Sequence, residues 1–249
     1  VWVTMTSGPE PMRVNLQPAY ILHSRPYRDS SLLLETFTAE HGRLGLVARG
    51  ARRRARGGSG AALLQPFTPL LLSFSGRSEL KTLTAMESVG SALALRGDRL
   101  YSGMYLNELL VRLLHRHDPH PQLFAAYGET LARLVGAIQS EEVLRSFELT
   151  LLEELGYSLD LSSDGRTGEP VRAGGLYQYE PEYGMVQLSA NAVSPRGAYS
   201  GAELLAMASG QFSGIARKAS KRLLRDALAV HLGGAPLRSR DLFQCEGTL

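Results

Sequence analysis

From Ala19 to about Ser88, apolar and polar positions alternate with the two-residue period of β-strands. Turn residues such as Glu40-His41-Gly42 interrupt the alternation, and Arg25-Pro26 is expected to end the first strand because proline cannot donate a ladder hydrogen bond. Two further prolines, Pro66 and Pro69, force an edge or a break in the fourth strand. The expected strands cover residues 19–24, 31–38, 43–50, 63–74 and 79–85. Five short strands within about 70 residues are what a small Greek-key barrel of the OB (oligonucleotide/oligosaccharide-binding) type requires.

From Leu100 the hydrophobic period becomes helical. Two core-facing stripes are formed by Leu106, Leu109, Leu110, Leu113 and Leu114, and by Leu123, Tyr127, Leu131, Leu134 and Ile138. A third helix is expected to start at Ser140 as N-cap and to end before Gly156. Three packed helices can make a core of their own, so we expect a domain boundary near residues 88–98.

Residues 157–199 lose the helical period and are rich in glycine, proline and tyrosine. Within them, Leu176–Tyr179 and Met185–Leu188 are expected to form a β-hairpin that turns at residues 181–184. Helices resume at Ser200-Gly201-Ala202-Glu203, which is a capping-box pattern, and a last helix is expected from Gly214 to Leu232.

The predicted fold is therefore α+β and multi-domain. An OB-fold β-barrel over residues 13–88 is followed by an α-helical domain over residues 98–249, with a small β-hairpin insertion at about 157–199. Residues 1–12 lack the basic and apolar regions of a signal peptide, and we expect a disordered leader or a segment foreign to the native chain.

Charge is distributed unevenly along the 249 residues, although the net charge is only +3. Residues 1–81 hold eleven Lys+Arg against five Asp+Glu, which gives +6, and the other 168 hold sixteen against nineteen, which gives −3. A basic amino-terminal third on a mildly acidic body suggests contact with a polyanion. No apolar run approaches the roughly 20 residues that cross a bilayer. The single cysteine, Cys245, excludes an internal disulfide and a cysteine-based zinc site.

The basic residues gather on the predicted barrel and above all in the segment that leaves its third strand. Guanidinium groups match phosphate oxygens as fixed forks of donors, and Tyr27, in a loop beside a proline, is the best candidate for stacking on a base. A solvated surface loop is the competing interpretation of the same segment. The candidate nucleic-acid-binding residues are Arg25, Tyr27, Arg28, Arg43, Arg49, Arg52, Arg53, Arg54 and Arg56.

A second basic set lies on the last helix, where Lys218, Lys221, Arg222 and Arg225 recur at helical spacing and make one face cationic. This face could seat an acidic peptide, with nearby apolar residues taking the hydrophobic end of that peptide. A solvated amphipathic helix is the alternative.

Signatures of catalysis are missing from the sequence: it has no phosphate-binding Walker loop, no nucleophile elbow, and no carboxylate set for nuclease metals. The cluster His115, His117 and His120 fits a solvated helix end better than a metal site, and Cys245 has no base beside it in sequence. We therefore predict that the chain is not an enzyme, and we expect no metal and no cofactor.

Several motifs resemble those of the bacterial RecO family of recombination mediators, and together they cover nearly the whole chain. They include Leu22-His23-Ser24-Arg25-Pro26-Tyr27, Leu46-Val47-Ala48-Arg49-Gly50-Ala51-Arg52, Leu64-Gln65-Pro66-Phe67, Tyr105-Leu106-Asn107-Glu108-Leu109-Leu110, Arg145-Ser146-Phe147-Glu148-Leu149 and Pro236-Leu237-Arg238-Ser239-Arg240-Asp241-Leu242-Phe243. The resemblance implies a protein of the cytoplasm and nucleoid that binds single- and double-stranded DNA and anneals complementary strands. It also implies partners: RecR, the acidic C-terminal tail of single-strand-binding protein (SSB) and, indirectly, RecA.

On this resemblance, the acidic SSB tail would bind near Arg145, Arg217, Lys218, Lys221, Arg222 and Arg225. Some members of the family carry a four-cysteine zinc site in the segment that corresponds to residues 157–199, and this chain has no cysteine there. The sequence thus resembles the zinc-free branch, whose hairpin would be held by packing alone.

Two other functions fit the residues less well. One is an RNA- or DNA-binding structural or regulatory protein with an OB barrel and a helical interaction domain, and the other is a metal-dependent nuclease.

Overall fold

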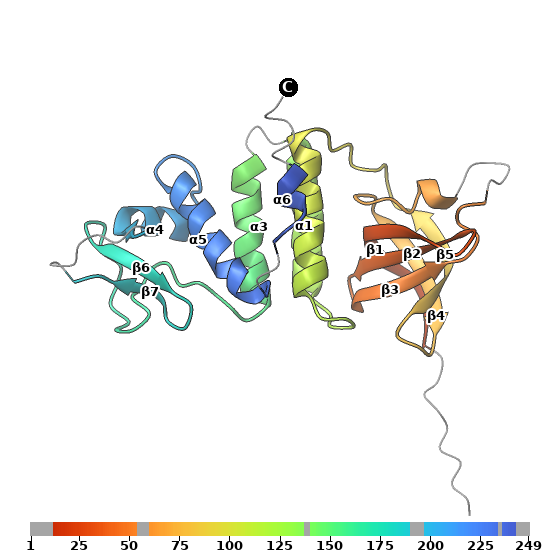
Figure 1. The fold of residues 1–249 in the computed structure, drawn as a ribbon, viewed down its shortest axis with the longest axis horizontal. Coiled ribbons are helices and arrows are strands. Elements are labelled where there is room, and N and C mark those ends of the chain that lie inside the picture. Colours follow the sequence, from red (N-terminus) through yellow and green to blue (C-terminus); the bar gives the residue numbers. More distant parts are fainter. Residues whose placement is uncertain (1–11, 54–59, 137–139, 190–196, 234–235, 243–249) are drawn as a thin grey trace, which may run out of the picture. The chain divides into compact units, whose positions relative to one another are not determined.

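The computed structural model describes residues 12–53, 60–136, 140–189, 197–233 and 236–242. The chain divides into two compact units (Figure 1). One comprises the residues up to Arg96 together with Gly103–Leu131, and the other comprises Gly97–Ser102 and the residues from Ala132 onward. Among the described residues, no helix has both the length and the hydropathy that a membrane span needs.

The first unit contains the predicted five-stranded barrel. Its elements are β1 (Met12–Tyr27), β2 (Ser31–Thr38), β3 (Gly42–Ala48), the short 3₁₀ helix η1 (Gly60–Ala62), β4 (Leu70–Gly76) and β5 (Lys81–Ser88). The barrel is closed in the order β1-β2-β3-β5-β4, and neighbouring strands are antiparallel except β3 and β5, which pair in parallel. The predicted OB-like barrel is confirmed.

Alternation along the strands fills the barrel. Leu34 of β2 pairs directly with Leu46 of β3, and both side chains are fully buried. Two threonines are also buried, and each satisfies its hydroxyl locally: Thr36 Oγ1 donates to the Leu44 carbonyl and Thr38 Oγ1 to the Gly42 carbonyl, both at 2.9 Å. Neither threonine therefore leaves its hydroxyl without a hydrogen bond in the core.

Proline affects the strands differently from the prediction. β1 does not end at Arg25-Pro26 but continues to Tyr27, with Pro26 opposite Leu32 of β2. The reason is that β4 pairs with β1 only as far as Ala19, so the later part of β1 is an edge on that side, where proline is tolerated. The expected break at Pro66 and Pro69 is present, since β4 starts only at Leu70.

Two helices pack on the barrel within the same unit. They are α1 (Asp98–Leu113), from Gly103 onward, and α2 (Pro121–Gly136), as far as Leu131. Buried Asn107 of α1 donates to the Leu22 carbonyl of β1 at 2.9 Å and accepts from the hydroxyl of Tyr127 at 2.5 Å. The sequence-based boundary at residues 88–98, which assigned both helices to a helical domain, stays a prediction.

Aromatic rings complete this contact. Tyr20 of β1 and Phe37 of β2 both meet Phe124 and Tyr127 of α2, with ring centroids 5.1–6.3 Å apart in tilted or edge-to-face arrangements. Such pairs contribute about 0.5–1.5 kcal/mol each beyond the area they bury.

The second unit combines helices with a small sheet. Its elements are α3 (Ser140–Glu154), β6 (Leu176–Glu180), β7 (Gly184–Gln187), β8 (Tyr199–Ser200), α4 (Gly201–Ala208), α5 (Ala216–His231) and α6 (Ser239–Leu242), and the order of the sheet is β7-β6-β8. The predicted hairpin is confirmed as β6 and β7, and the capping box is confirmed by the reciprocal bonds between Ser200 and Glu203. The strand β8 was not predicted, because two residues are too few to show a period.

A buried carboxylate joins the hairpin to the loop before it. Asp164, 3% exposed, accepts hydrogen bonds from the backbone N–H groups of Arg166 and Thr167 and, at 2.5 Å, of Gln187 on β7. These bonds, led by the one from Gln187, lower the pKa of the Asp164 carboxyl below its ordinary value. The expectation that packing alone holds the hairpin is therefore incomplete, because a carboxylate hub contributes as well.

This hub predicts a pH-dependent effect of Asp164→Asn. A carboxyl whose pKa is lowered by folding stabilises the fold above its unfolded pKa, near 4, and loses that contribution as the pH falls through the folded value. At pH 7 the substitution should speed amide hydrogen exchange in peptides that cover residues 160–187 by about tenfold or more. At about pH 3 the difference from the original protein should shrink. Mass spectrometry of the exchanged peptides measures both, Glu182→Gln is the matched control on the exposed turn, and a difference independent of pH would contradict the prediction.

Candidate nucleic-acid interface

Three segments of the barrel enclose a groove of about 680 Å³. They are the β1–β2 turn, the chain leaving β3, and the β4–β5 turn with the start of β5. Its lining includes Tyr27, Arg28, Arg49, Arg53, Ser78 and Thr82. Turns between strands 1 and 2 and between strands 4 and 5 border the ligand face of OB barrels in general.

Backbone hydrogen bonds fix the positions of the first two segments. The N–H of Arg52 donates to the Ser30 carbonyl at 3.0 Å, and the guanidinium of Arg52 reaches the Asp29 carbonyl at 3.5 Å. The β1–β2 turn is therefore tied to the chain that leaves β3. Arg28 within this turn has a φ of +52°, in the left-handed region that few non-glycine residues adopt.

The groove is strongly cationic. Arg28, Arg49 and Arg53 line it, Arg28 and Arg49 are exposed, and none of the described residues that form its wall is acidic. The guanidinium carbon of Arg28 lies 5.2 Å from the centroid of the Tyr27 ring, which is half-buried at the end of β1. The wall thus offers cations, hydroxyl groups and one aromatic ring.

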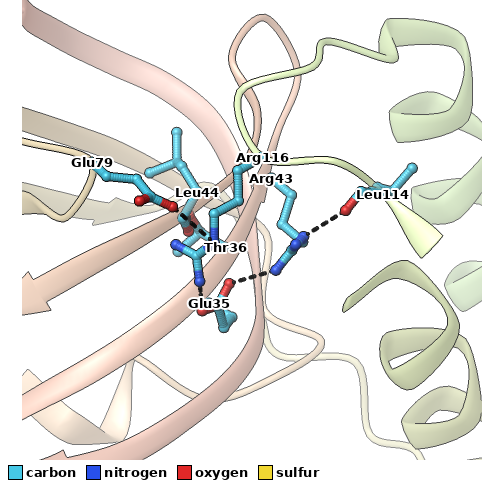
Figure 2. A network of polar contacts seen from close by, with 7 residues as sticks. All are labelled: Glu35, Thr36, Arg43, Leu44, Glu79, Leu114 and Arg116. Atoms are coloured by element: carbon cyan, nitrogen blue, oxygen red, sulfur yellow. Dashed lines mark hydrogen bonds and ion pairs between the residues drawn. The ribbon is translucent and has the colours of Figure 1, made fainter. Parts of the chain in front are cut away.

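Arg43 stands apart from this groove and belongs to a polar network that joins the barrel to the α1–α2 loop (Figure 2). Its Nη1 donates to Glu35 Oε2 at 3.1 Å, and its Nε donates to the Leu114 carbonyl at 3.0 Å. Arg116 binds the other oxygen of Glu35 and lies 3.4 Å from Glu79. The Arg43 side chain is only 14% exposed, and its guanidinium binds Glu35 and the Leu114 carbonyl of the loop.

The remaining predicted residues of the barrel differ in how far the structure describes them. Arg25, on β1, and Arg52, next to Arg53 in the sequence, are both exposed, and neither lines the groove. Arg54 and Arg56 lie outside the described residues. Sequence reasoning missed Ser78 and Thr82, because an isolated hydroxyl in a turn or strand gives no pattern, and it missed Arg116, whose contact with Glu35 spans 81 residues.

Comparison with known proteins assigns both parts of the chain. The family model "Recombination protein O N terminal" matches residues 12–92, and "Recombination protein O C terminal" matches residues 95–241. The chain belongs to the RecO family. Proteins named DNA repair protein RecO are 47% identical in Methylococcus capsulatus, over 94% of this chain and 95% of that protein, and 47% identical in Nitrosococcus oceani, over 94% of each. The one from Pseudomonas aeruginosa is 48% identical over 91% of this chain and 94% of that protein.

Membership of the RecO family confirms the family prediction made from the motifs and assigns the chain to DNA repair and recombination. It is this membership that supports the prediction of a non-enzymatic protein.

The second predicted site of this RecO-family chain lies on α5 and the adjoining α3. Lys218 and Arg225 are exposed, whereas Arg217 and Lys221 bind Glu141 of α3 at 2.6 and 3.3 Å. Partial burial acts to raise the pKa of the Glu141 carboxyl, but the hydrogen bonds and charges of Arg217 and Lys221 outweigh it and lower that pKa. Part of the cationic face is therefore neutralised by this carboxylate.

Two of the predicted partner-binding arginines serve the packing of the unit. Arg222 donates to the Ala198 carbonyl at 2.8 Å, and its guanidinium carbon lies 4.2 Å from the centroid of the Tyr199 ring. Arg145 is only 11% exposed and pairs at 2.8 Å with Glu148, which is fully buried. Lys218 and Arg225 of α5, in contrast, are exposed.

The histidine cluster has structural partners. The His117 N–H donates to the Arg43 carbonyl at 2.9 Å, and His120 Nε2 lies 3.4 Å from Asp118 Oδ2. Burial, followed by the charge of Lys81, lowers the pKa of His117. Within the described part of the chain, no group of three or more His, Cys, Asp or Glu side chains is arranged to hold a metal ion.

These geometries predict that arginines of the barrel fall into two classes. Arg43→Ala should lower the free energy of unfolding by about 2 kcal/mol, because it removes hydrogen bonds from a partly buried carboxylate and a carbonyl. Arg49→Ala, the matched control in the groove, should change it by less than about 0.5 kcal/mol, as is usual for exposed positions. Urea unfolding followed by near-UV circular dichroism of the Tyr20–Phe37–Tyr127 cluster measures both. Equal effects of the two substitutions would contradict this division.

Proposed function

We propose that this RecO-family protein is a recombination mediator that holds single- and double-stranded DNA on its barrel by charge and anneals complementary strands. The observation that carries the proposal is the groove in which Arg28, Arg49 and Arg53 face the solvent and no described wall residue is acidic. Three guanidinium groups within one groove provide forked donors for phosphate oxygens.

The proposed mechanism is electrostatic. Neutralised phosphates release condensed counterions, so binding gains free energy that declines as salt concentration rises. Two complementary strands repel each other through the same phosphates. A basic surface that holds both strands lowers that repulsion and lets base pairing proceed without ATP, and the proposal therefore needs no bond-making residue.

A second part of the proposal concerns the acidic tail of SSB, with which the protein, together with RecR, would help to load RecA at the nucleoid. Lys218, Lys221 and Arg225 lie on one row of α5, beside Arg217. Ile215, just before this helix, is 65% exposed. Cations next to an exposed apolar residue fit a peptide that is acidic and ends in an apolar side chain.

The barrel assignment predicts a change in salt dependence. Arg49→Ala combined with Arg53→Ala should weaken binding of a labelled single-stranded oligonucleotide and reduce the slope of log K against log salt by up to about 1.4, at roughly 0.7 per phosphate contact. Fluorescence anisotropy across a salt series measures the slope. The control is Arg13→Ala with Arg96→Ala, which removes two exposed cations that do not line the groove. If both double variants give the slope of the original protein, DNA binding does not depend on the groove.

The same assay addresses the RNA-binding alternative. DNA and RNA oligonucleotides of matched length and sequence are competed against each other. A clear preference for RNA would favour a structural or regulatory RNA-binding protein over a recombination mediator.

The tail assignment predicts that Lys218→Glu with Arg225→Glu weakens binding of the SSB C-terminal peptide at least about tenfold, since each reversed charge replaces attraction by repulsion. These two positions spare the Glu141 pairs and the stacking of Arg222 on Tyr199. Titration calorimetry with the peptide measures the affinity. Arg133→Glu with Arg172→Glu gives the same change in net charge at exposed sites elsewhere in the unit and should leave binding nearly unchanged. Retained affinity in the first variant would exclude the α5 row as the binding site.

A further inference from the structure

Among the described residues that line the barrel groove, Tyr27 is the one with an aromatic side chain, and it does not belong to the barrel core. Phe74 lies in the barrel core and Phe37 packs against α2, and both are fully buried, whereas Tyr27 is half-buried at the end of β1. Its backbone is held by the pairing of Tyr27 with Ser31 on β2. The ring is therefore fixed at its base and lines the groove, with the guanidinium carbon of Arg28 5.2 Å from its centroid.

The groove has the dimensions of a small-ligand site. Its volume of about 680 Å³ lies within the range, about 300–1,000 Å³, of pockets that enclose small organic molecules. An extended peptide or a duplex would lie across such a groove, while a single nucleotide unit can enter it.

Hydroxyl groups supply the remaining polar surface. Ser30, Ser31, Ser78 and Thr82 line the groove, and each hydroxyl both donates and accepts. A wall of this kind satisfies the edge of any base without selecting one. Charged residues that would select a base edge by accepting only, namely aspartate and glutamate, are not among the described residues of the wall.

Whether the nucleic acid is a duplex or a single strand determines which of its groups the wall of the groove can contact. In a duplex the bases are stacked and paired, so a groove on a protein surface meets phosphates and sugars. In a single strand a base can turn out and stack on an aromatic ring, and such stacking tolerates every sequence because every base has a π-face.

We propose that the groove is a subsite for one unpaired nucleotide, whose base stacks on the Tyr27 ring while its flanking phosphates bind Arg49 and Arg53. The inference rests on the proposed DNA binding and adds to it a means of distinguishing strands. Charge holds either form of DNA, and Tyr27 gives the single strand an extra contact that a duplex does not make. The sequence preference of this contact is low, because hydroxyls and a ring form the wall.

The experiment compares Tyr27→Leu and Tyr27→Phe with the original full-length protein. Each binds an oligo-dT strand and a blunt hairpin duplex with the same number of phosphates, at one salt concentration and in a salt series. Tyr27→Leu should weaken oligo-dT binding by roughly 5- to 150-fold, which corresponds to about 1–3 kcal/mol per stacked base. It should leave duplex binding within about twofold and both salt slopes unchanged. Tyr27→Phe, which keeps the ring, should behave like the original protein, and Tyr183→Leu is the control at an exposed tyrosine of the other unit.

Three results would overturn the inference, of which two are oligo-dT binding that survives Tyr27→Leu and a loss that is equal for the duplex and the single strand. Loss of oligo-dT binding in Tyr27→Phe as well would also overturn it, since the stacking ring is still present there. Failure of the proposed function is a different result: the original protein would then bind neither the oligo-dT strand nor the duplex at low salt.

Discussion

A partly buried carboxylate has to be neutralised, and this requirement determines which cations of the protein remain free. Glu35 lies on β2 with 20% of its side chain exposed, and Arg43 and Arg116 bind one oxygen each. Glu148, fully buried on α3, takes Arg145 in the same way. Breaking such a pair leaves an uncompensated charge in a poorly solvated place, which is strongly destabilising. These arginines therefore stabilise the fold, and the cations left in the groove are those without such a carboxylate among its wall residues.

The third strand connects the two uses of arginine. β3 starts beside Arg43, in the network that joins the barrel to the α1–α2 loop, and it leads at its other end to Arg49 and Arg53 in the groove. Within three residues of the β4–β5 turn, two line the groove and the one between them belongs to the Glu35 network. Ser78 and Leu80 line the groove, whereas Glu79 between them lies 3.4 Å from Arg116. An acidic residue at the rim is thus directed toward the network, and the groove keeps its positive potential.

Much of the barrel followed from local pattern, and so did the arginines and the tyrosine of the groove, but the long-range contacts of the other predicted arginines did not. The alternation of residues 31–38 and 43–50 predicts β2 and β3, because period two reports burial of one face directly. The pairings of Arg43 with Glu35 or of Asn107 with the Leu22 carbonyl leave no trace at short range, since their partners come together only when the chain has folded. For the same reason the sequence predicts Arg222 on a cationic partner-binding face, whereas in the structure it contacts Tyr199 and the Ala198 carbonyl. Helical spacing places a residue on a face of its helix, but the neighbouring element decides what that face meets.

In the proposed function DNA also has to be released, which a small number of arginines in the groove favours. Each neutralised phosphate adds to the affinity and to its salt dependence, so a surface with many free arginines would hold a strand too firmly for another protein to take it over. In this chain Arg43, Arg116 and Arg145 are paired with carboxylates, and Arg217 and Lys221 share Glu141. Of these residues only Arg43 lies among the first 81, whose net charge of +6 already counts its partner Glu35. The described wall of the groove holds three arginines, which in the proposed function favours binding that is general in sequence and readily reversed.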